Sequence, residues 1–212
     1  MFNNNDLENE EEEQIKIILL GNTGVGKTAI ITKFDQNTYD NKAMATYAPN
    51  FIKKDLKINN EVVKIHVWDT AGQEKFNSVS KLFVKNAKII ILVYDITDKS
   101  SFEGLDYWHN FIINDLVQDV VIGLAGNKVD LLNEDGFEEQ VSQEEAEKFA
   151  EKLGAEFSIL SAKCDKQGID DFFKKLITKY IDKFFIPIND RKTIMISNKT
   201  QKQTDKKKKN CC

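Results

Sequence analysis

A glycine-rich run ending in Lys-Thr is the first feature of this chain that could do chemistry. Residues 21–28 read Gly-Asn-Thr-Gly-Val-Gly-Lys-Thr, which fits the G-x-x-x-x-G-K-[ST] pattern of loops that cradle phosphate groups. The glycines let successive backbone N–H groups point inward, and a following helix adds its positive N-terminal end. Lys27 would reach the β- and γ-phosphates, and the Thr28 hydroxyl would hold Mg²⁺. The loop therefore predicts a nucleoside di- or triphosphate site, with the expected residues Gly21, Asn22, Thr23, Gly24, Val25, Gly26, Lys27 and Thr28.

Strand-like and helix-like patterns alternate around this loop from Gln14 onward. The expected strands are Ile15–Leu20, Phe51–Ile58, Val62–Asp69, Lys88–Ile96, Val120–Asn127 and Glu156–Ser161. The expected helices cover residues 28–34, 142–153 (opened by a capping box at Ser142) and 169–184. The glycine loop thus follows a strand and precedes a helix, which is the context that its pattern needs.

This alternation predicts an α/β fold of three layers, a six-stranded and mostly parallel sheet with helices on both faces. Lys88–Ile96 and Val120–Asn127 are continuous apolar runs, as in parallel strands covered on both sides. Phe51–Ile58 alternates in polarity and suits one antiparallel edge strand, joined to Val62–Asp69 by a hairpin across Asn59-Asn60. Ligands of such sheets bind at the carboxyl ends of the strands, where the glycine loop lies.

Composition and charge exclude several other classes of protein. No apolar run reaches the roughly 18 residues of a membrane span, and no signal peptide is expected at the acidic N-terminus. Three cysteines and two separated histidines favour neither a zinc site nor a disulfide scaffold, which indicates a reducing compartment. We expect a disordered acidic segment at residues 1–13, one domain at 14–186 and a flexible basic tail at 187–212. The mildly acidic body argues against nucleic-acid binding.

Four further segments bear on the base and the reaction. They are Trp-Asp-Thr-Ala-Gly-Gln-Glu at 68–74, Asn-Lys-Val-Asp at 127–130, Ser-Ala-Lys at 161–163, and Thr46, which lies 18 residues after Thr28. The guanine edge offers an N1–H and an exocyclic amine side by side, and the two oxygens of the Asp130 carboxylate could accept both hydrogen bonds. Adenine lacks the amine on that edge, so the pattern favours guanine.

Together and in this order, the segments resemble the small GTPases of the Ras superfamily from about Gln14 to about Phe184. Residues 64–76, residues 92–97 and the terminal Cys211-Cys212 look like those of a Rab GTPase. The resemblance implies a P-loop G domain that binds GTP or GDP with Mg²⁺. It also implies a molecular switch that binds effectors on membranes in vesicle trafficking and slowly hydrolyses GTP to GDP and phosphate.

The resemblance further implies a role for each matching residue. Gln73 would be the catalytic residue that orients the attacking water, and Gly72 would donate its N–H to the γ-phosphate. Mg²⁺ would be held by Thr28, Thr46 and Asp69. The guanosine would be held by Tyr39 (stacked on the base), Asn127 (a brace), Lys128 (its stem along the base), Asp130, Ser161, Ala162 (its N–H to guanine O6) and Lys163.

The basic end of the chain predicts attachment to a membrane. Lys206–Lys209 followed by Cys211-Cys212 looks like a double-geranylgeranylation signal, and two lipids beside a basic segment anchor stably. We expect a monomer at the cytoplasmic face of an endomembrane compartment, with a cytosolic pool. The partners that the resemblance implies are a GTPase-activating protein, an exchange factor, effectors of the switch regions, a GDP-dissociation inhibitor and the prenylation machinery.

Three features of the chain bear on its partners and on its rate of hydrolysis. The first switch reads Thr-Tyr-Ala-Pro-Asn-Phe at 46–51 instead of the usual Thr-Ile-Gly-Val-Asp-Phe, so the effectors are not determined. Thr23, a β-branched residue close to the expected place of Gln73, would slow hydrolysis. The single arginine, Arg191, lies in the tail, so an arginine finger would have to come from a partner. The alternative functions are a nucleotide-independent interaction module and a soluble P-loop ATPase or kinase.

Overall fold

The computed structural model describes residues 14–40, 50–70, 84–115 and 120–184 of this chain. The chain divides into two units, residues 1–180 and 181–212. The sheet and the helices that cover it belong to the first unit, and residues 181–184 of the second continue a helix. In these described ranges no helix is both long enough and apolar enough to cross a membrane. The domain limits expected at residues 14 and 186 stay predictions.

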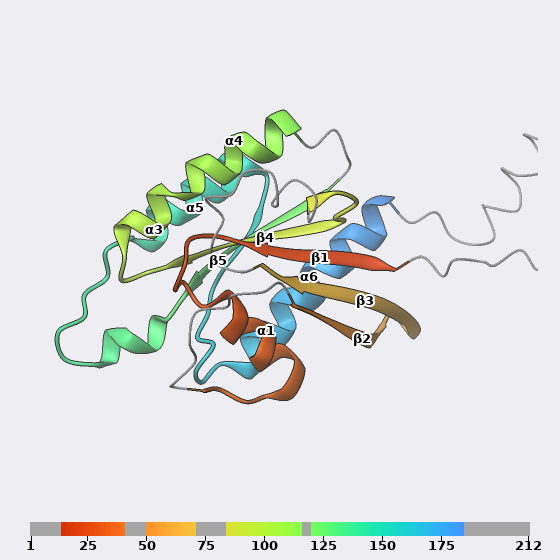
Figure 1. The fold of residues 1–212 in the computed structure, drawn as a ribbon, viewed down its shortest axis with the longest axis horizontal. Helices are drawn as coiled ribbons and strands as arrows, with labels where there is room; N and C mark the ends of the chain where they lie inside the picture. Colours follow the sequence, from red (N-terminus) through yellow and green to blue (C-terminus); the bar gives the residue numbers. More distant parts are fainter. Residues whose placement is uncertain (1–13, 41–49, 71–83, 116–119, 185–212) are drawn as a thin grey trace, which may run out of the picture. The chain divides into compact units, whose positions relative to one another are not determined.

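Six strands alternate with helices in the described residues, as the sequence predicts (Figure 1). In chain order the elements are β1 (Ile15–Leu20), α1 (Lys27–Gln36), β2 (Asn50–Ile58), β3 (Glu61–Asp69), β4 (Ile89–Asp95), α3 (Lys99–Glu103), α4 (Leu105–Asp115), β5 (Val121–Asn127), the 3₁₀ helix η1 (Val129–Asn133), α5 (Gln143–Leu153), β6 (Glu156–Ile159) and α6 (Lys166–Phe184). Every expected strand is confirmed, with ends that differ by two residues at most. Two helix boundaries differ from the expected ones. Helix α6 begins three residues earlier than expected, at Lys166, and α1 ends at Gln36 instead of the expected residue 34.

The strands form one sheet in the order β2-β3-β1-β4-β5-β6. Only the pairing of β2 with β3 is antiparallel among the described pairs, which confirms the antiparallel edge strand. Asn59 and Asn60 both adopt positive φ, 49° and 68°, the geometry that a tight two-residue hairpin requires. The carboxyl ends of β1, β4 and β5 lie at the left of Figure 1. This edge of the sheet carries the loops of the expected site.

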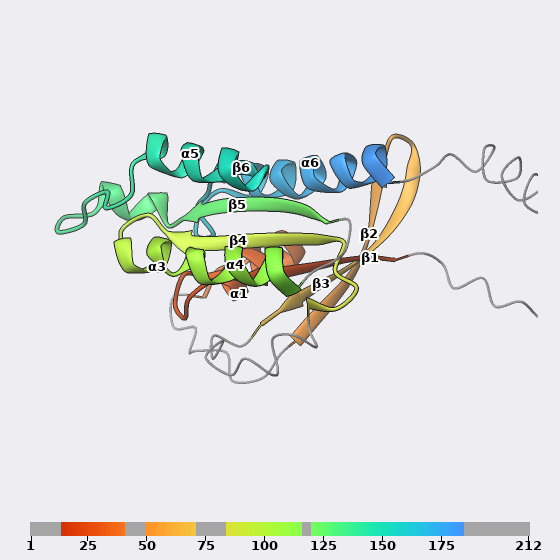
Figure 2. The same cartoon turned by 90° about the horizontal axis from the view of Figure 1, so that it is seen from above.

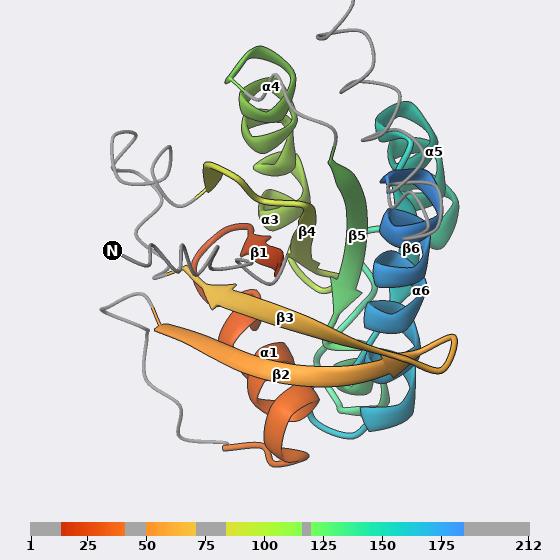
Figure 3. The ribbon, with the colours of Figure 1, turned by 90° about the vertical axis from the view of Figure 1, so that its right-hand side faces the viewer.

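Helices cover both faces of the sheet, so the fold has the three expected layers (Figures 2 and 3). Figure 3 shows α3 and α4 on one side and α1 on the other. On the first face, α3, α4 and α5 pack on strands β1, β4 and β5 in a buried cluster that includes Ile18, Leu20, Ile90, Leu92, Tyr94, Phe102, Leu105, Trp108, Phe111, Ile112, Leu124, Ala146 and Ala150. On the second face, Phe34 of α1 stacks on Phe173 of α6 with ring centroids 4.0 Å apart. Every residue of β4 is buried, as its apolar run predicts.

Local capping explains where α5 begins and ends. The Ser142 hydroxyl accepts a hydrogen bond from the Glu145 N–H, which confirms the expected cap. Gly154 ends the helix with φ 62°, a left-handed conformation that glycine adopts without steric cost. Its position fixes the turn into β6, and thereby the loop that follows β6 at the edge of the site.

Candidate nucleotide-binding site

The glycine loop between β1 and α1 depends on close packing as well as on backbone freedom. Gly21, Gly24 and Gly26 have φ of +147°, +82° and +98°. A Cβ atom on Gly21 would lie 2.1 Å from the Val93 carbonyl oxygen, and one on Gly26 would lie 2.2 Å from Asn127 Nδ2. A Cβ on Gly24 would meet nothing within 4 Å. Two glycines therefore seat the loop against β4 and β5, while the third only lets it turn.

Lys27 is the first residue of α1, and its side-chain ammonium group lies within this loop. Its side chain is 5% exposed, and Nζ donates hydrogen bonds to the carbonyl oxygens of Gly21 (2.6 Å) and Asn22 (2.9 Å). The N-terminal end of the ten-residue α1 adds a partial positive charge at the same place. A buried ammonium group and a helix N-terminus under a bent glycine backbone fit a polyphosphate chain.

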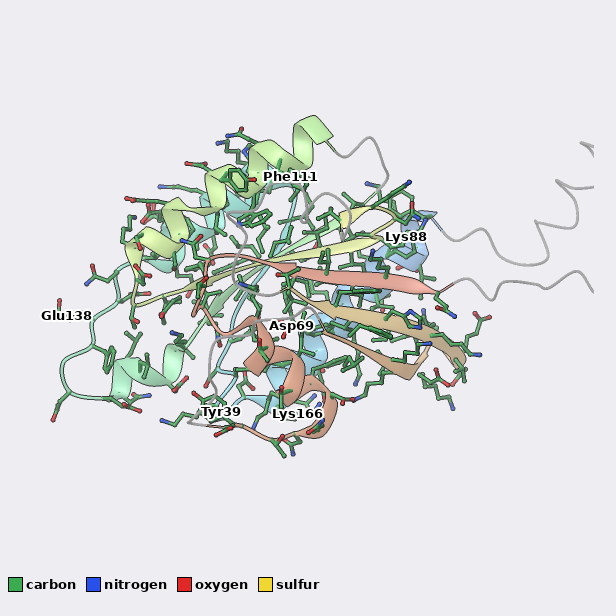
Figure 4. The ribbon with its side chains drawn as sticks, viewed as in Figure 1. Tyr39, Asp69, Lys88, Phe111, Glu138 and Lys166 are labelled. Atoms are coloured by element: carbon green, nitrogen blue, oxygen red, sulfur yellow. The ribbon has the colours of Figure 1, made fainter. Side chains whose placement is uncertain are left out.

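Oxygen donors suited to Mg²⁺ lie on the two elements next to the loop. Thr28 is exposed in the first turn of α1, and Asp69, 4% exposed, ends β3 (Figure 4). The Thr70 hydroxyl donates to the Leu19 carbonyl oxygen at 2.9 Å, which ties the end of β3 to β1 two residues before the glycine loop. A hydroxyl and a carboxylate are the hard oxygen ligands that Mg²⁺ prefers beside phosphate, so the residues present fit that ion.

Asn127, the last residue of β5, joins the glycine loop to a second loop. Its amide Nδ2 donates to the Val25 carbonyl oxygen at 2.9 Å, and its Oδ1 accepts from the Ala162 N–H at 3.0 Å. The side chain is 1% exposed, so both hydrogen bonds are shielded from water. The structure thus brings together the phosphate loop and the 161–163 loop, which lie far apart in sequence. The Ala162 N–H that the resemblance assigns to guanine O6 is used by Asn127 here.

Asp130 lies in η1, directly after β5, and is held by the same second loop. Its Oδ1 accepts a 2.5 Å hydrogen bond from the Ser161 hydroxyl, and its Oδ2 lies 3.9 Å from Lys163 Nζ. Ser161 is itself 1% exposed. Each carboxylate oxygen has two lone pairs, so Oδ1 keeps acceptor capacity beside the Ser161 bond, and both oxygens remain able to accept from a pair of neighbouring donors on a purine.

The two lysines of the expected base site each have a carboxylate partner. Lys128 adopts a left-handed backbone, φ 72°, and its Nζ lies 2.7 Å from Asp95 Oδ2. Lys163 Nζ donates to Glu134 at 2.8 Å, and this hydrogen bond, helped by the charges of Glu134, Asp130 and Tyr39, raises the pKa of Lys163. Paired in this way, the ammonium groups are held at the rim of the site while their alkyl stems remain available to pack against a base.

Sequence reasoning missed Asp95 and Glu134. Asp95 could have been found, because it ends β4 and pairs in register with Asn127 of β5, which puts it at the carboxyl edge of the sheet. Tyr39, 42% exposed, lies in the segment that follows α1 (Figure 4). The remaining expected residues, Thr46, Gly72, Gln73, Cys211 and Cys212, lie outside the described residues.

A phosphate loop at the carboxyl edge of a parallel sheet, braced against a loop suited to a purine, defines a P-loop nucleotide-binding domain. The family model described as the Ras family matches residues 16–182. The Ras-like GTP-binding protein RYL2 of Yarrowia lipolytica is 34% identical over 176 residues, which cover 82% of this chain and 84% of that protein. The human Ras-related proteins Rab-12 and Rab-21 are 34% and 36% identical over 176 and 167 residues, covering 82% and 79% of this chain and 70% and 72% of theirs. The chain belongs to the Ras family and is a Rab-like small GTPase, a GTP hydrolase of vesicle trafficking.

This membership confirms the class of protein that the motifs predict and removes the alternative of a P-loop ATPase or kinase. It also accounts for the ligand, since proteins of this family bind GTP and GDP. Rab GTPases as a family act with regulators and effectors and associate with intracellular membranes.

Proposed function

We propose that this chain is a lipid-anchored switch in which one guanosine nucleotide spans the glycine loop and the 161–163 loop. The single observation that supports this most strongly is the pair of Asn127 hydrogen bonds, 2.9 and 3.0 Å long, that join the two loops through a buried amide. A ligand that contacts one of these loops would also restrain the other, because neither loop could move alone without breaking a buried hydrogen bond.

Base recognition in this proposal belongs to Asp130 and its supports. Asp130 accepts from guanine N1–H and the exocyclic amine, while the Ser161 hydroxyl keeps the carboxylate in one orientation at 2.5 Å. N–H groups of the 161–163 loop meet guanine O6, with Ala162 sharing its hydrogen between Asn127 and the base. Tyr39 and the stem of Lys128 cover the two faces of the ring.

Phosphate binding and hydrolysis use the other end of the site. Lys27 and the loop amides of residues 21–26 bind the phosphates, and Thr28, Thr46 and Asp69 hold Mg²⁺, which neutralises charge on the β- and γ-phosphate oxygens when bound. Gln73 orients the attacking water, and Gly72 senses the γ-phosphate. Since Arg191 is the only arginine of the chain, the stabilising arginine comes from an activating protein, which accelerates turnover by roughly 10³–10⁵.

The membrane and the partners complete the proposal. Two geranylgeranyl groups on Cys211 and Cys212, with Lys206–Lys209 beside them, hold the protein at the cytoplasmic face of an endomembrane compartment. An exchange factor loads GTP, effectors read the switch regions, and a GDP-dissociation inhibitor maintains a cytosolic pool.

Nucleotide content and effector capture test the proposal together. The purified protein should carry GDP and not ADP, and should release phosphate from GTP slowly in single turnover. A Gln73→Leu variant should recover effectors from a membrane extract, whereas Thr28→Asn, which loses the expected metal ligand, should recover far fewer. Equal recovery by the two variants would refute switching, and bound ADP would refute the base assignment.

A further inference from the structure

Lys33 is a buried cation in the last turn of α1 that the proposed nucleotide site does not use. The residue is 9% exposed, and burying an ammonium group is costly unless it is hydrogen-bonded. Its Nζ donates to the carbonyl oxygen of Lys163 at 3.1 Å. Across the ranges that the structure describes, that carbonyl is the hydrogen-bond partner of the Lys33 ammonium group. The contact crosses 130 residues of sequence and ends in the loop that follows β6.

Two other lysines near the C-terminal end of α1 cap that helix, which Lys33 does not do. Lys54 of β2 and Lys166 of α6 both donate to the Phe34 carbonyl oxygen, at 2.9 and 3.2 Å, and both lie over the Phe34 ring, 4.8 and 5.5 Å from its centroid. They satisfy the C-terminal end of α1 itself. Lys33 reaches away from its own helix to a carbonyl in a different loop, so its contact is not needed to cap α1.

The carbonyl that Lys33 holds belongs to the loop that carries the expected base contacts. Ser161 holds Asp130, and the Ala162 N–H is bonded to Asn127. Lys33 thus holds the far end of a three-residue loop whose near end is held from β5 and η1. The same helix starts with Lys27 inside the glycine loop. Through α1, the phosphate end and the base end of the site share one rigid element.

We propose that Lys33 is a positioning residue for guanine: by holding the Lys163 carbonyl, it keeps the N–H groups of the 161–163 loop where they meet guanine O6. This inference rests on the proposed nucleotide site and adds to it a residue that touches neither base nor phosphate. Removal of the ammonium group frees the loop on the side away from Asn127, and the O6 contact is lost while the phosphate contacts remain.

A chemical double-mutant cycle separates this role from a general loss of stability. GDP is compared with 6-thioguanosine 5′-diphosphate, which keeps the N1–H and the exocyclic amine but replaces O6 by a sulfur that accepts hydrogen bonds only weakly, in the wild type and in Lys33→Met. A charge-assisted hydrogen bond of this kind converts to about tenfold in affinity, so the GDP dissociation constant should rise about tenfold while that of the analogue changes by less than about twofold. The preference for GDP should therefore fall about tenfold. An equal weakening of both nucleotides would overturn the inference.

Two further variants serve as controls for this experiment. Lys54→Met removes a lysine of β2 that donates to the same end of α1 rather than to the 161–163 loop, so it should leave the GDP preference unchanged. Lys33→Gln is too short to reach the Lys163 carbonyl but keeps a polar end, and should reproduce the loss of preference if the methionine variant does not fold. A wild type that binds neither nucleotide would refute the proposed function. A wild type that prefers GDP by the same ratio as both Lys33 variants would refute this inference alone.

Discussion

Removing the Asn127 amide tests the bridge on which the site depends. In Asn127→Ala, the Val25 carbonyl oxygen and the Ala162 N–H each lose a hydrogen-bond partner at a place where the side chain is 1% exposed. An unsatisfied buried group costs about 1–3 kcal/mol, so two of them cost about 2–6 kcal/mol. If the nucleotide-bound form is destabilised by even the lower value, relative to the free protein, the GDP dissociation constant rises about thirtyfold. Displacement of a fluorescent GDP measures this constant, and urea unfolding measures the part of the loss that falls on the fold.

Gln167→Ala is the matched control for this experiment. The Gln167 amide also makes two hydrogen bonds, both 2.9 Å long and both to the Asp171 carboxylate, but it is exposed on α6. Because water replaces exposed partners, this variant should lose less than about 0.5 kcal/mol and keep its GDP affinity. An Asn127→Ala protein that binds GDP within about threefold of the wild type would show that the two loops are held by other contacts, and the reasoning from buried hydrogen bonds would fail.

Three further predictions concern the core, the base and the dependence on pH. The Tyr94 hydroxyl is fully buried without a hydrogen-bond partner in the described part of the chain, and burial raises its pKa, so Tyr94→Phe should increase the free energy of unfolding by about 1 kcal/mol in urea titrations. A loss of stability would contradict that reading. Asp130→Asn replaces an acceptor by an amide that can donate to a carbonyl, so calorimetry should show weaker GDP binding and stronger binding of xanthosine diphosphate, whose C2 bears a carbonyl; an unchanged order of affinities would contradict the assignment. Hydrogen bonds from Lys175 and Lys179 hold the pKa of Glu156 below its ordinary value of 4.5. Because the folded-state pKa is the lower one, this stabilisation is present above pH 4.5 and is lost as the pH falls through the folded-state pKa, and Glu156→Gln should flatten that part of the stability profile.

The strands could be predicted closely because their patterns are determined locally. β1 has the expected bounds, since an apolar run ends at a glycine that packs against the Val93 carbonyl. The ends of β6 and α6 were less predictable. β6 stops before Ser161, whose hydroxyl bonds to Asp130. α6 starts three residues early because the Asp165 carboxylate accepts from the Gly168 N–H, a cap that the helical periodicity alone does not reveal.

The site residues could be named from spacing, but their partners could not. The motif at 127–130 identifies Asn127 as a brace, whereas its attachment to Val25 and Ala162 depends on which loops meet at the edge of the folded sheet. Lys33 carries no motif, and its partner lies 130 residues away. Asp95 becomes significant only through the register of β4 against β5. Tertiary contacts of this kind leave no local pattern, because they depend on the topology of the whole sheet.

Helix α1 gives these separate contacts a common mechanical basis. Lys27 and Lys33 are six residues apart, so the helix fixes their backbone separation at about 9 Å along its axis. Lys27 is bonded to the glycine loop and Lys33 to the 161–163 loop, while Asn127 ties those same loops together from β5. Two connections between the same pair of loops, one through a helix and one through a side chain, resist a change in their distance better than either alone. In the proposed site, a nucleotide would then be selected by its length as well as by its hydrogen-bonding edge, because its phosphates and base would have to reach two loops whose separation the protein has already set.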